Sequence, residues 1–150
     1  MITISQAHQD YLKVIYRLTE ENGRATTNQI AAALDVTPAS VSNMLKKMAE
    51  GEAPLLQYQK HKGVTLTAVG QQTCLEIMRH HRLLETFLCQ KLGFSQDEVH
   101  EEACRLDHVL TEELEARIAA VLEHPTHDPH GQPIPTVDLE IPETSYHEVS

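Results

Sequence analysis

The 150-residue chain has no tryptophan, and aromatic residues make up only 4% of it. A hydrophobic core must therefore be built mainly from aliphatic side chains. The three cysteines, Cys74, Cys89 and Cys104, are too few for a disulfide framework, which favours a reducing compartment. The sequence contains no apolar run of membrane-spanning length and does not begin with a basic and then apolar signal pattern. We therefore expect a cytoplasmic protein with no membrane partner.

The net charge of −10 is distributed unevenly along the chain. Residues 1–73 carry seven Lys and Arg against six Asp and Glu, whereas residues 74–150 carry five against sixteen. An acidic total ordinarily argues against binding to nucleic acid, but here the acidic residues are concentrated in one half. A chain of this length holds one ordinary domain or two small ones. The two halves are expected to have different electrostatic roles.

Periodicity and turn signals in the first half predict three helices and a hairpin. Apolar residues recur at helical spacing over residues 7–21, and Thr27 is placed to cap a second helix. Pro38 suits the first position of a third helix. Two short strands, 55–59 and 64–66, flank a basic turn that contains glycine. Helix, helix, turn, helix and hairpin is the order of a winged helix-turn-helix.

The second half is predicted to continue as helices followed by a proline-rich segment. Helical patterns cover residues 67–92, a segment opened by a capping box of Ser95 and Glu98, and residues 111–122. Five of the seven prolines lie from residue 125 onward, which predicts a linker or extended arm with solvated histidines. The predicted fold is mainly α, with a winged helix-turn-helix over 1–73, an all-helical domain over 74–124 and a proline-rich tail or linker over 125–150.

The segment 36–47 has the composition of a DNA recognition helix. Small polar residues at its start let hydroxyl and backbone N–H groups approach phosphates, and the amide of Asn43 can pair with an adenine edge. Lysines in this helix and in the hairpin add attraction to phosphate. The same helix order also occurs in protein-interaction modules, but the basic hairpin favours double-stranded DNA. The residues predicted to bind DNA are Thr27, Thr37, Pro38, Ala39, Ser40, Ser42, Asn43, Lys46, Lys47, Lys60 and Lys62.

Side chains of metal-ligand type recur at helical spacing in the second half. Residues three and four apart share one helix face, so Cys104, Asp107 and His108 are expected to converge, with a further histidine one turn before them. His81 and Glu85 have the same four-residue spacing on the preceding helix. Thiolate, imidazole and carboxylate together suit a divalent transition metal, although spacing alone does not name it. The alternative is that each residue is structural, as part of a solvated face or, for the cysteine, as a small buried hydrophobe.

These motifs carry a family resemblance. The chain resembles the diphtheria-toxin-repressor family of iron- or manganese-dependent transcriptional regulators, from YLKVIY at 11–16 to GQPIP at 131–135. The most specific matches are TPASVS at 37–42, HHRLLE at 80–85 and VHEEACRLDH at 99–108. The resemblance implies a repressor, not an enzyme, that binds palindromic operator DNA as a homodimer with Mn(II) or Fe(II) as cofactor. The helical half would then be a metal-binding and dimerisation domain.

The resemblance also implies ligand sets, with three departures from the family pattern. Iron sensors are similar to this chain at Cys104 but have methionine in place of Asp10, whereas manganese sensors share the aspartate and usually have glutamate in place of the cysteine. Asp107 is one methylene shorter than the usual glutamate, and the SH3-like third domain of longer members is not expected here. Because Asp10 supplies a hard oxygen, we favour Mn(II) over Fe(II). The implied primary site is Asp10, Cys104, Asp107 and His108, and the implied ancillary site is His81, Glu85 and His100.

The implied primary site takes ligands from both halves of the chain. Coordination would therefore clamp the halves together and set the recognition helices of a dimer about 34–36 Å apart. A ligand shifts such an equilibrium only if it binds one conformation better than another. Two alternatives remain. One is a metalloenzyme whose open metal position activates water, and the other is a metal-independent winged-helix regulator that responds to an organic ligand. Metal-dependent retardation of DNA would separate all three.

Overall fold

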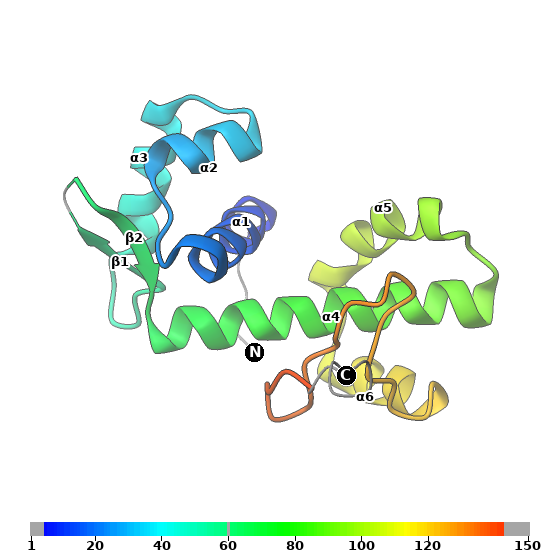
Figure 1. Ribbon diagram of the computed structural model, residues 1–150. Coiled ribbons are helices and arrows are strands. Elements are labelled where there is room, and N and C mark those ends of the chain that lie inside the picture. Colours follow the sequence, from blue (N-terminus) through cyan, green and yellow to red (C-terminus); the bar gives the residue numbers. More distant parts are fainter. Residues whose placement is uncertain (1–4, 60, 143–150) are drawn as a thin grey trace, which may run out of the picture. The chain divides into compact units, whose positions relative to one another are not determined.

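The computed structural model describes residues 5–59 and 61–142 (Figure 1). The chain divides into two compact units, one ending at Cys74 and one beginning at Leu75, and each is described by itself. No helix in the described ranges is long and apolar enough to cross a membrane. The elements in chain order are α1 (Gln6–Asn22), α2 (Thr27–Leu34), α3 (Pro38–Met48), β1 (Leu56–Gln59), β2 (Gly63–Leu66), α4 (Ala68–Leu92), α5 (Gln96–Leu106), the 3-10 helix η1 (Asp107–Val109) and α6 (Glu112–Val121).

The N-terminal unit is a three-helix domain with a two-stranded antiparallel hairpin. Strands β1 and β2 pair in the register that sets Leu56 opposite Leu66. The segment before α2 joins this sheet, because Ala25 and Val64 exchange two backbone hydrogen bonds of 3.0 and 2.8 Å. Gly63 has φ 88° and a Cβ there would lie 2.3 Å from the Ala25 carbonyl oxygen, so this close approach requires glycine. The predicted winged helix-turn-helix is confirmed.

The helix starts of the N-terminal unit are fixed by side-chain caps. Thr26, and not Thr27 as predicted, caps α2, because its hydroxyl accepts the Gln29 N–H while the Gln29 side chain returns to the Thr26 N–H. Thr27 is instead the first residue of the helix. Thr37 caps α3 in the same way by accepting the Ser40 N–H, and Pro38 begins the helix. These caps determine which side chains stand at the N-terminus of α3.

The core of the N-terminal unit is aliphatic, as the shortage of aromatic residues predicts. Leu12 and Ile15 of α1, Ile30 of α2, and Val41 and Leu45 of α3 are all 0% exposed. Complete burial of side chains of this size is worth about 1.5–3 kcal/mol each relative to exposure. Because α3 buries one stripe of side chains, its opposite stripe is left in solvent.

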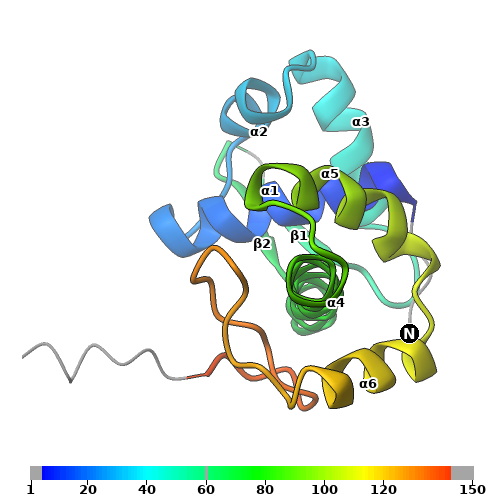
Figure 2. The same ribbon diagram turned by 90° about the vertical axis from the view of Figure 1, so that its right-hand side faces the viewer.

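The C-terminal unit is built around the second part of α4. Figure 2, which views α4 nearly end-on, shows α5 on one side of this helix and α6 with the following segment on the other. The residues that form its core come from all three helices, the turn before α6 and the segment after α6: Leu83, Leu84, Leu88, Val99, Ala103, Leu110, Ile118, Ala119, Leu122 and Ile134.

Residues 125–142 contain no helix or strand, yet they are packed against the C-terminal unit. Ile134 is 1% exposed, and the Pro135 carbonyl accepts a 2.9 Å hydrogen bond from the Arg79 guanidinium. The Pro133 carbonyl accepts a second one from Arg82. This differs from the linker that the proline content predicts. Proline and glycine indicate only that the chain turns. The burial of Ile134 depends on the apolar surface of α4 and α6, which composition does not show.

Candidate metal centre and DNA-binding surface

Helices α4 and α5 each place two metal-ligand side chains one turn apart. On α4, His81 and Glu85 are 7% and 2% exposed, and His81 Nε2 lies 3.0 Å from Glu85 Oε1. On α5, His100 and Cys104 repeat the four-residue spacing. Side chains at this spacing stand on the same face of a helix, so two adjoining faces supply the site.

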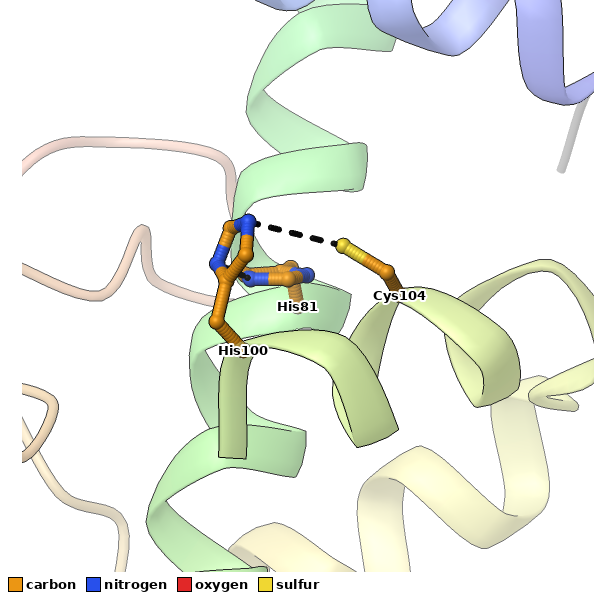
Figure 3. Close-up of side chains that lie close together, drawn as sticks. All are labelled: His81, His100 and Cys104. Atoms are coloured by element: carbon orange, nitrogen blue, oxygen red, sulfur yellow. Dashed lines mark hydrogen bonds between the residues drawn. The ribbon is translucent and has the colours of Figure 1, made fainter. Parts of the chain in front are cut away.

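The first group of ligands consists of His81, His100 and Cys104 (Figure 3). His81 Nε2 lies 3.2 Å from His100 Nδ1, and His100 Nε2 lies 3.7 Å from Cys104 Sγ. One ligand atom from each residue lies within 4.8 Å of the other two. The group offers two imidazole nitrogens and one sulfur.

The second group consists of Glu85, Asp128 and His130. His130 Nδ1 lies 3.4 Å from Glu85 Oε2, and Asp128 Oδ1 accepts the backbone N–H groups of His130 and Gln132 at 2.9 and 2.8 Å. Glu85 Oε2 and Asp128 Oδ2 are buried and accept no hydrogen bond from the residues that the structure describes. A buried carboxylate oxygen without a donor is costly, so these two oxygens fit a bound cation.

Asp128 and His130 are ligand candidates that the sequence reasoning missed. The proline-rich composition predicts solvated histidines in this region, His130 among them. The available signal was the pair of ligand types two residues apart, followed by Gly131 in a turn. What the sequence did not show is that this turn packs beside Glu85.

Electrostatics keep the Glu85 carboxylate ionised. Burial raises the pKa of Glu85. The hydrogen bond from His81 and the charges of His81, His130 and His100 lower it by more, so the pKa lies below its ordinary value. Burial and the neighbouring carboxylates Glu85 and Asp128 raise the pKa of Cys89, which favours its neutral thiol.

The predicted convergence of Cys104, Asp107 and His108 assumed one continuous helix, and that assumption is wrong. Helix α5 ends at Leu106, and Asp107 begins a 3-10 turn. Asp107 is 5% exposed and its Oδ2 lies 3.3 Å from His81 Nδ1, whereas the His108 side chain is 46% exposed. His108 Nδ1 is 3.9 Å from Asp107 Oδ1. The turn thus directs Asp107 toward His81 on α4.

Asp10 lies in the N-terminal unit, on the first turns of α1. Its side chain is exposed and accepts a 3.2 Å hydrogen bond from Gln6 Nε2. Its membership of the metal site stays a prediction.

The predicted DNA-binding residues form a polar surface on the N-terminal unit. The α3 stripe opposite Val41, Leu45 and Met48 is solvent-exposed and carries amide, hydroxyl and ammonium groups. Lys60 lies outside the described residues. Thr27 and Ser42 are half-buried, and the exposed members are Thr37, Pro38, Ala39, Ser40, Asn43, Lys46, Lys47 and Lys62.

Comparison with known protein families matches both units of the chain. Residues 3–64 match the iron-dependent repressor N-terminal DNA-binding domain. Residues 67–136 match the iron-dependent repressor metal-binding and dimerisation domain.

Curated relatives and solved structures agree with these matches. The iron-dependent repressor IdeR of Mycobacterium bovis is 38% identical over 125 residues, covering 83% of this chain and 54% of the relative. An HTH-type transcriptional regulator of Methanocaldococcus jannaschii is 34% identical over 80% of this chain and 95% of its own length. A manganese-dependent transcriptional repressor in complex with manganese is 42% identical, with a TM-score of 0.77 over 91% of this chain and 62% of that structure. The repressor ScaR with bound Zn2+ is 35% identical, with a TM-score of 0.79 over 94% of this chain and 64% of that structure.

The chain spans about half the length of the iron-dependent repressors that it matches. The regulator from Methanocaldococcus jannaschii, in contrast, is matched over nearly its whole length.

Proposed function

Because the chain belongs to the iron-dependent repressor family, we propose that it is a transcriptional repressor that binds operator DNA as a homodimer when a divalent metal is bound. We propose Mn(II) or Fe(II) as the metal and genes of metal homeostasis as the targets. The proposal includes no enzymatic activity.

The observation that carries this proposal is the pair of buried carboxylate oxygens, Glu85 Oε2 and Asp128 Oδ2, that lack hydrogen-bond donors among the described residues. Oxygen ligands of this kind suit hard cations such as Mn(II), and imidazole suits iron. His130 completes a set of two oxygens and one nitrogen. A metal bound here would give these two oxygens the partner that no hydrogen-bond donor among the described residues supplies.

A second ligand set is proposed from the family resemblance. It comprises Asp107 and His108 of the C-terminal unit, Cys104 of α5, and Asp10 of α1. A set with ligands on both units would make DNA binding respond to metal, because a ligand shifts a conformational equilibrium only through different affinities for its states. The recognition surface itself consists of the exposed stripe of α3 and the hairpin.

The exposed α3 residues support DNA as the partner of this surface. Asn43 has the amide geometry that pairs with a base edge, and Lys46 and Lys47 follow it on the same exposed side. The hydroxyl of Thr37 donates a 2.9 Å hydrogen bond to Ser40 Oγ at the helix start. Backbone N–H groups at that helix end remain suited to a phosphate.

The test uses DNA selected from a random duplex pool in the presence of Mn(II), followed by fluorescence anisotropy with metal-free, Mn(II)-loaded and Fe(II)-loaded protein. We expect tight binding with either metal and its loss when a chelator is added. Selection of no duplex would exclude the DNA-binding proposal. Equal affinity with and without metal would identify a metal-independent regulator.

A double variant tests whether the buried carboxylates bind the metal. Glu85→Gln combined with Asp128→Asn should lower Mn(II) affinity by on the order of tenfold or more, since two charged ligands are lost. Glu113→Gln, which alters an exposed pair with Arg117 on α6, is the matched control and should bind Mn(II) normally. Unchanged Mn(II) affinity in the double variant would remove these carboxylates from the proposed site.

A further inference from the structure

The C-terminal unit contains a cavity of about 230 Å³ that none of the proposed metal ligands lines. It lies where α4 and α6 meet the segment that follows them, and its apolar wall includes Leu83, Ala119 and Ile134 (Figure 2). These three residues are 1%, 2% and 1% exposed. Thr136 and Val137, which also line the cavity, are exposed, so a small molecule can enter from solvent.

The buried polar group of this cavity is the guanidinium of Arg79, a residue that is 9% exposed. Its Nε donates to Glu115 Oε1, and its Nη1 donates a 2.9 Å hydrogen bond to the Pro135 carbonyl. An arginine has five N–H donors. These two bonds therefore leave three donors without an acceptor in the part of the chain that the structure describes. Glu115 is already shared, because its Oε2 lies 2.7 Å from His80 Nε2.

The charge of the lining favours an anion. No Asp or Glu of the described ranges lines this cavity, whereas a neighbouring cavity that Arg79 also lines contains Glu76, Glu112 and Glu115. A guanidinium pairs with a carboxylate through two parallel N–H bonds, which is its strongest neutralising contact. The free donors of Arg79 and the absence of lining carboxylates thus select a carboxylate as the polar end of a ligand.

We propose that this cavity binds a small monocarboxylic acid, with its carboxylate on Arg79 and its apolar body against Leu83 and Ile134. Ligand sites typically combine an apolar wall with a few polar groups that fix orientation, and this lining has both. The volume lies below the roughly 300–1,000 Å³ of sites for drug-sized ligands, so the acid must be small. The Thr136 hydroxyl accepts the Glu140 N–H, and its own O–H is a further donor.

The cavity adjoins the turn that carries Asp128 and His130, and the following consequence rests on the proposed function. Thr126 and Ile134 both line the cavity, and they close that turn through a 2.8 Å bond from the Ile134 N–H to the Thr126 carbonyl. An acid that contacts both residues favours the closed turn, which holds Asp128 and His130 beside Glu85. Binding of the acid is therefore expected to raise the affinity for Mn(II), and Mn(II) must raise the affinity for the acid equally.

The direct test is calorimetric titration of the metal-free full chain with benzoate and with hexanoate. We expect saturable one-to-one binding of at least one of these acids. The matching neutral amide, benzamide or hexanamide, should bind at least about tenfold more weakly, because it cannot form the charge-assisted pair with Arg79. Saturable binding of neither acid, or equal binding of an acid and its amide, would overturn the proposal.

Two variants locate the binding. Arg79→Lys keeps the charge beside Glu115 but loses the planar fork, so it should weaken binding of the acid by at least about tenfold. Val137→Asp places a carboxylate at the 75% exposed rim and should also weaken it. Val121→Asp is the matched control, because Val121 is 54% exposed on α6 and does not line the cavity.

Circular dichroism verifies the helical content of each variant. If Arg79→Lys lost its fold, the comparison of Val137→Asp with Val121→Asp would decide. Equal affinity of these two variants for the acid would overturn the assignment to this cavity.

The predicted coupling is measured by the electron paramagnetic resonance signal of free Mn(II). A saturating concentration of the acid should lower free Mn(II) in a mixture with the wild-type chain, and it should do so much less with Val137→Asp. Unchanged free Mn(II) in the wild-type mixture would overturn the coupling. Binding of the acid to the metal-free chain needs neither Mn(II) nor DNA, so failure of this site and failure of metal-activated DNA binding are distinguishable.

Discussion

Glu85 Oε1 lies 3.0 Å from His81 Nε2, one turn away on the same face of α4. This pair joins the two ligand groups, because His81 belongs with His100 and Cys104 while Glu85 belongs with Asp128 and His130. Ligands of different hardness therefore adjoin within one packed unit. A substitution in either group is expected to affect the other through this contact.

Asp107→Ala or His108→Ala is expected to abolish metal-activated operator binding while leaving the dimer intact. Each removes a proposed ligand, and neither residue contributes to the apolar core of the C-terminal unit. Anisotropy with labelled DNA measures the binding, and light scattering measures the mass. Asp97→Ala, an exposed change on the first turn of α5, is the control. Normal metal-dependent binding by both variants would disprove the ligand assignment.

Asn43→Ala is expected to cost about 1–3 kcal/mol of operator binding and to relax the preference at one base pair. The reason is that an amide on the exposed stripe of α3 can make two hydrogen bonds to an adenine edge. Binding to a panel of single-base operator variants measures the preference. If affinity fell equally for every sequence, Asn43 would contact the DNA backbone instead.

Glu115→Gln is expected to destabilise the metal-free protein by about 3 kcal/mol at pH 7. The reason is that the Glu115 carboxylate forms a buried ion pair with Arg79 and lies 2.7 Å from His80 Nε2. Burial raises the pKa of Glu115, but the hydrogen bonds and charges of His80 and Arg79 lower it below the usual 4.5. A lowered pKa contributes stability above the unfolded value and loses it as pH falls through the folded value. The gap between wild type and variant should therefore shrink in acid.

Denaturant unfolding at pH 7 and in the acid range measures this gap. Glu113→Gln, which alters the exposed pair with Arg117, is the control and should change stability by less than about 0.5 kcal/mol. A Glu115→Gln deficit that stayed constant across the whole pH range would contradict the linkage.

Ile134→Ala is expected to destabilise the protein by about 2–5 kcal/mol, because Ile134 is 1% exposed and packs into the C-terminal core. Ile141→Ala, at a residue that is 42% exposed, should have a much smaller effect. Thermal and denaturant unfolding compare the two. Equal, small effects would mean that the segment 125–142 contributes no packing energy.

Asp10→Met is expected to shift metal-activated DNA binding from Mn(II) toward Fe(II) under anaerobic conditions. A thioether is a softer ligand than a carboxylate, and manganese binds it less well. Anisotropy titrations with each metal measure the ratio of the two activation midpoints. An unchanged ratio would show that Asp10 does not set the preference.

The order of the helices, and their approximate bounds except the end of α5, were predictable from local signals. Cap residues, Pro38 and the stopping glycines act within a few residues of the backbone groups they satisfy, and a stripe of apolar side chains reports which helix face is buried. The winged helix-turn-helix, the exposed face of α3 and the pairing of His81 with Glu85 all follow from such short-range spacing. One error was equally local, because Thr26 and the adjacent Thr27 are both suited to cap α2, and Thr26 does so.

Partners that are distant in the sequence were decided only by tertiary packing. Asp128 and His130 face Glu85 because Ile134 is drawn into the core formed by α4 and α6, and composition alone reports only that the segment turns. Asp107 lies beside His81, which groups with His100 and Cys104, because α5 ends at Leu106 and a 3-10 turn redirects the chain. The sequence therefore determines which ligand types are present. Which of them lie together depends on side-chain packing between elements that are distant in the sequence, and helical spacing does not predict that packing.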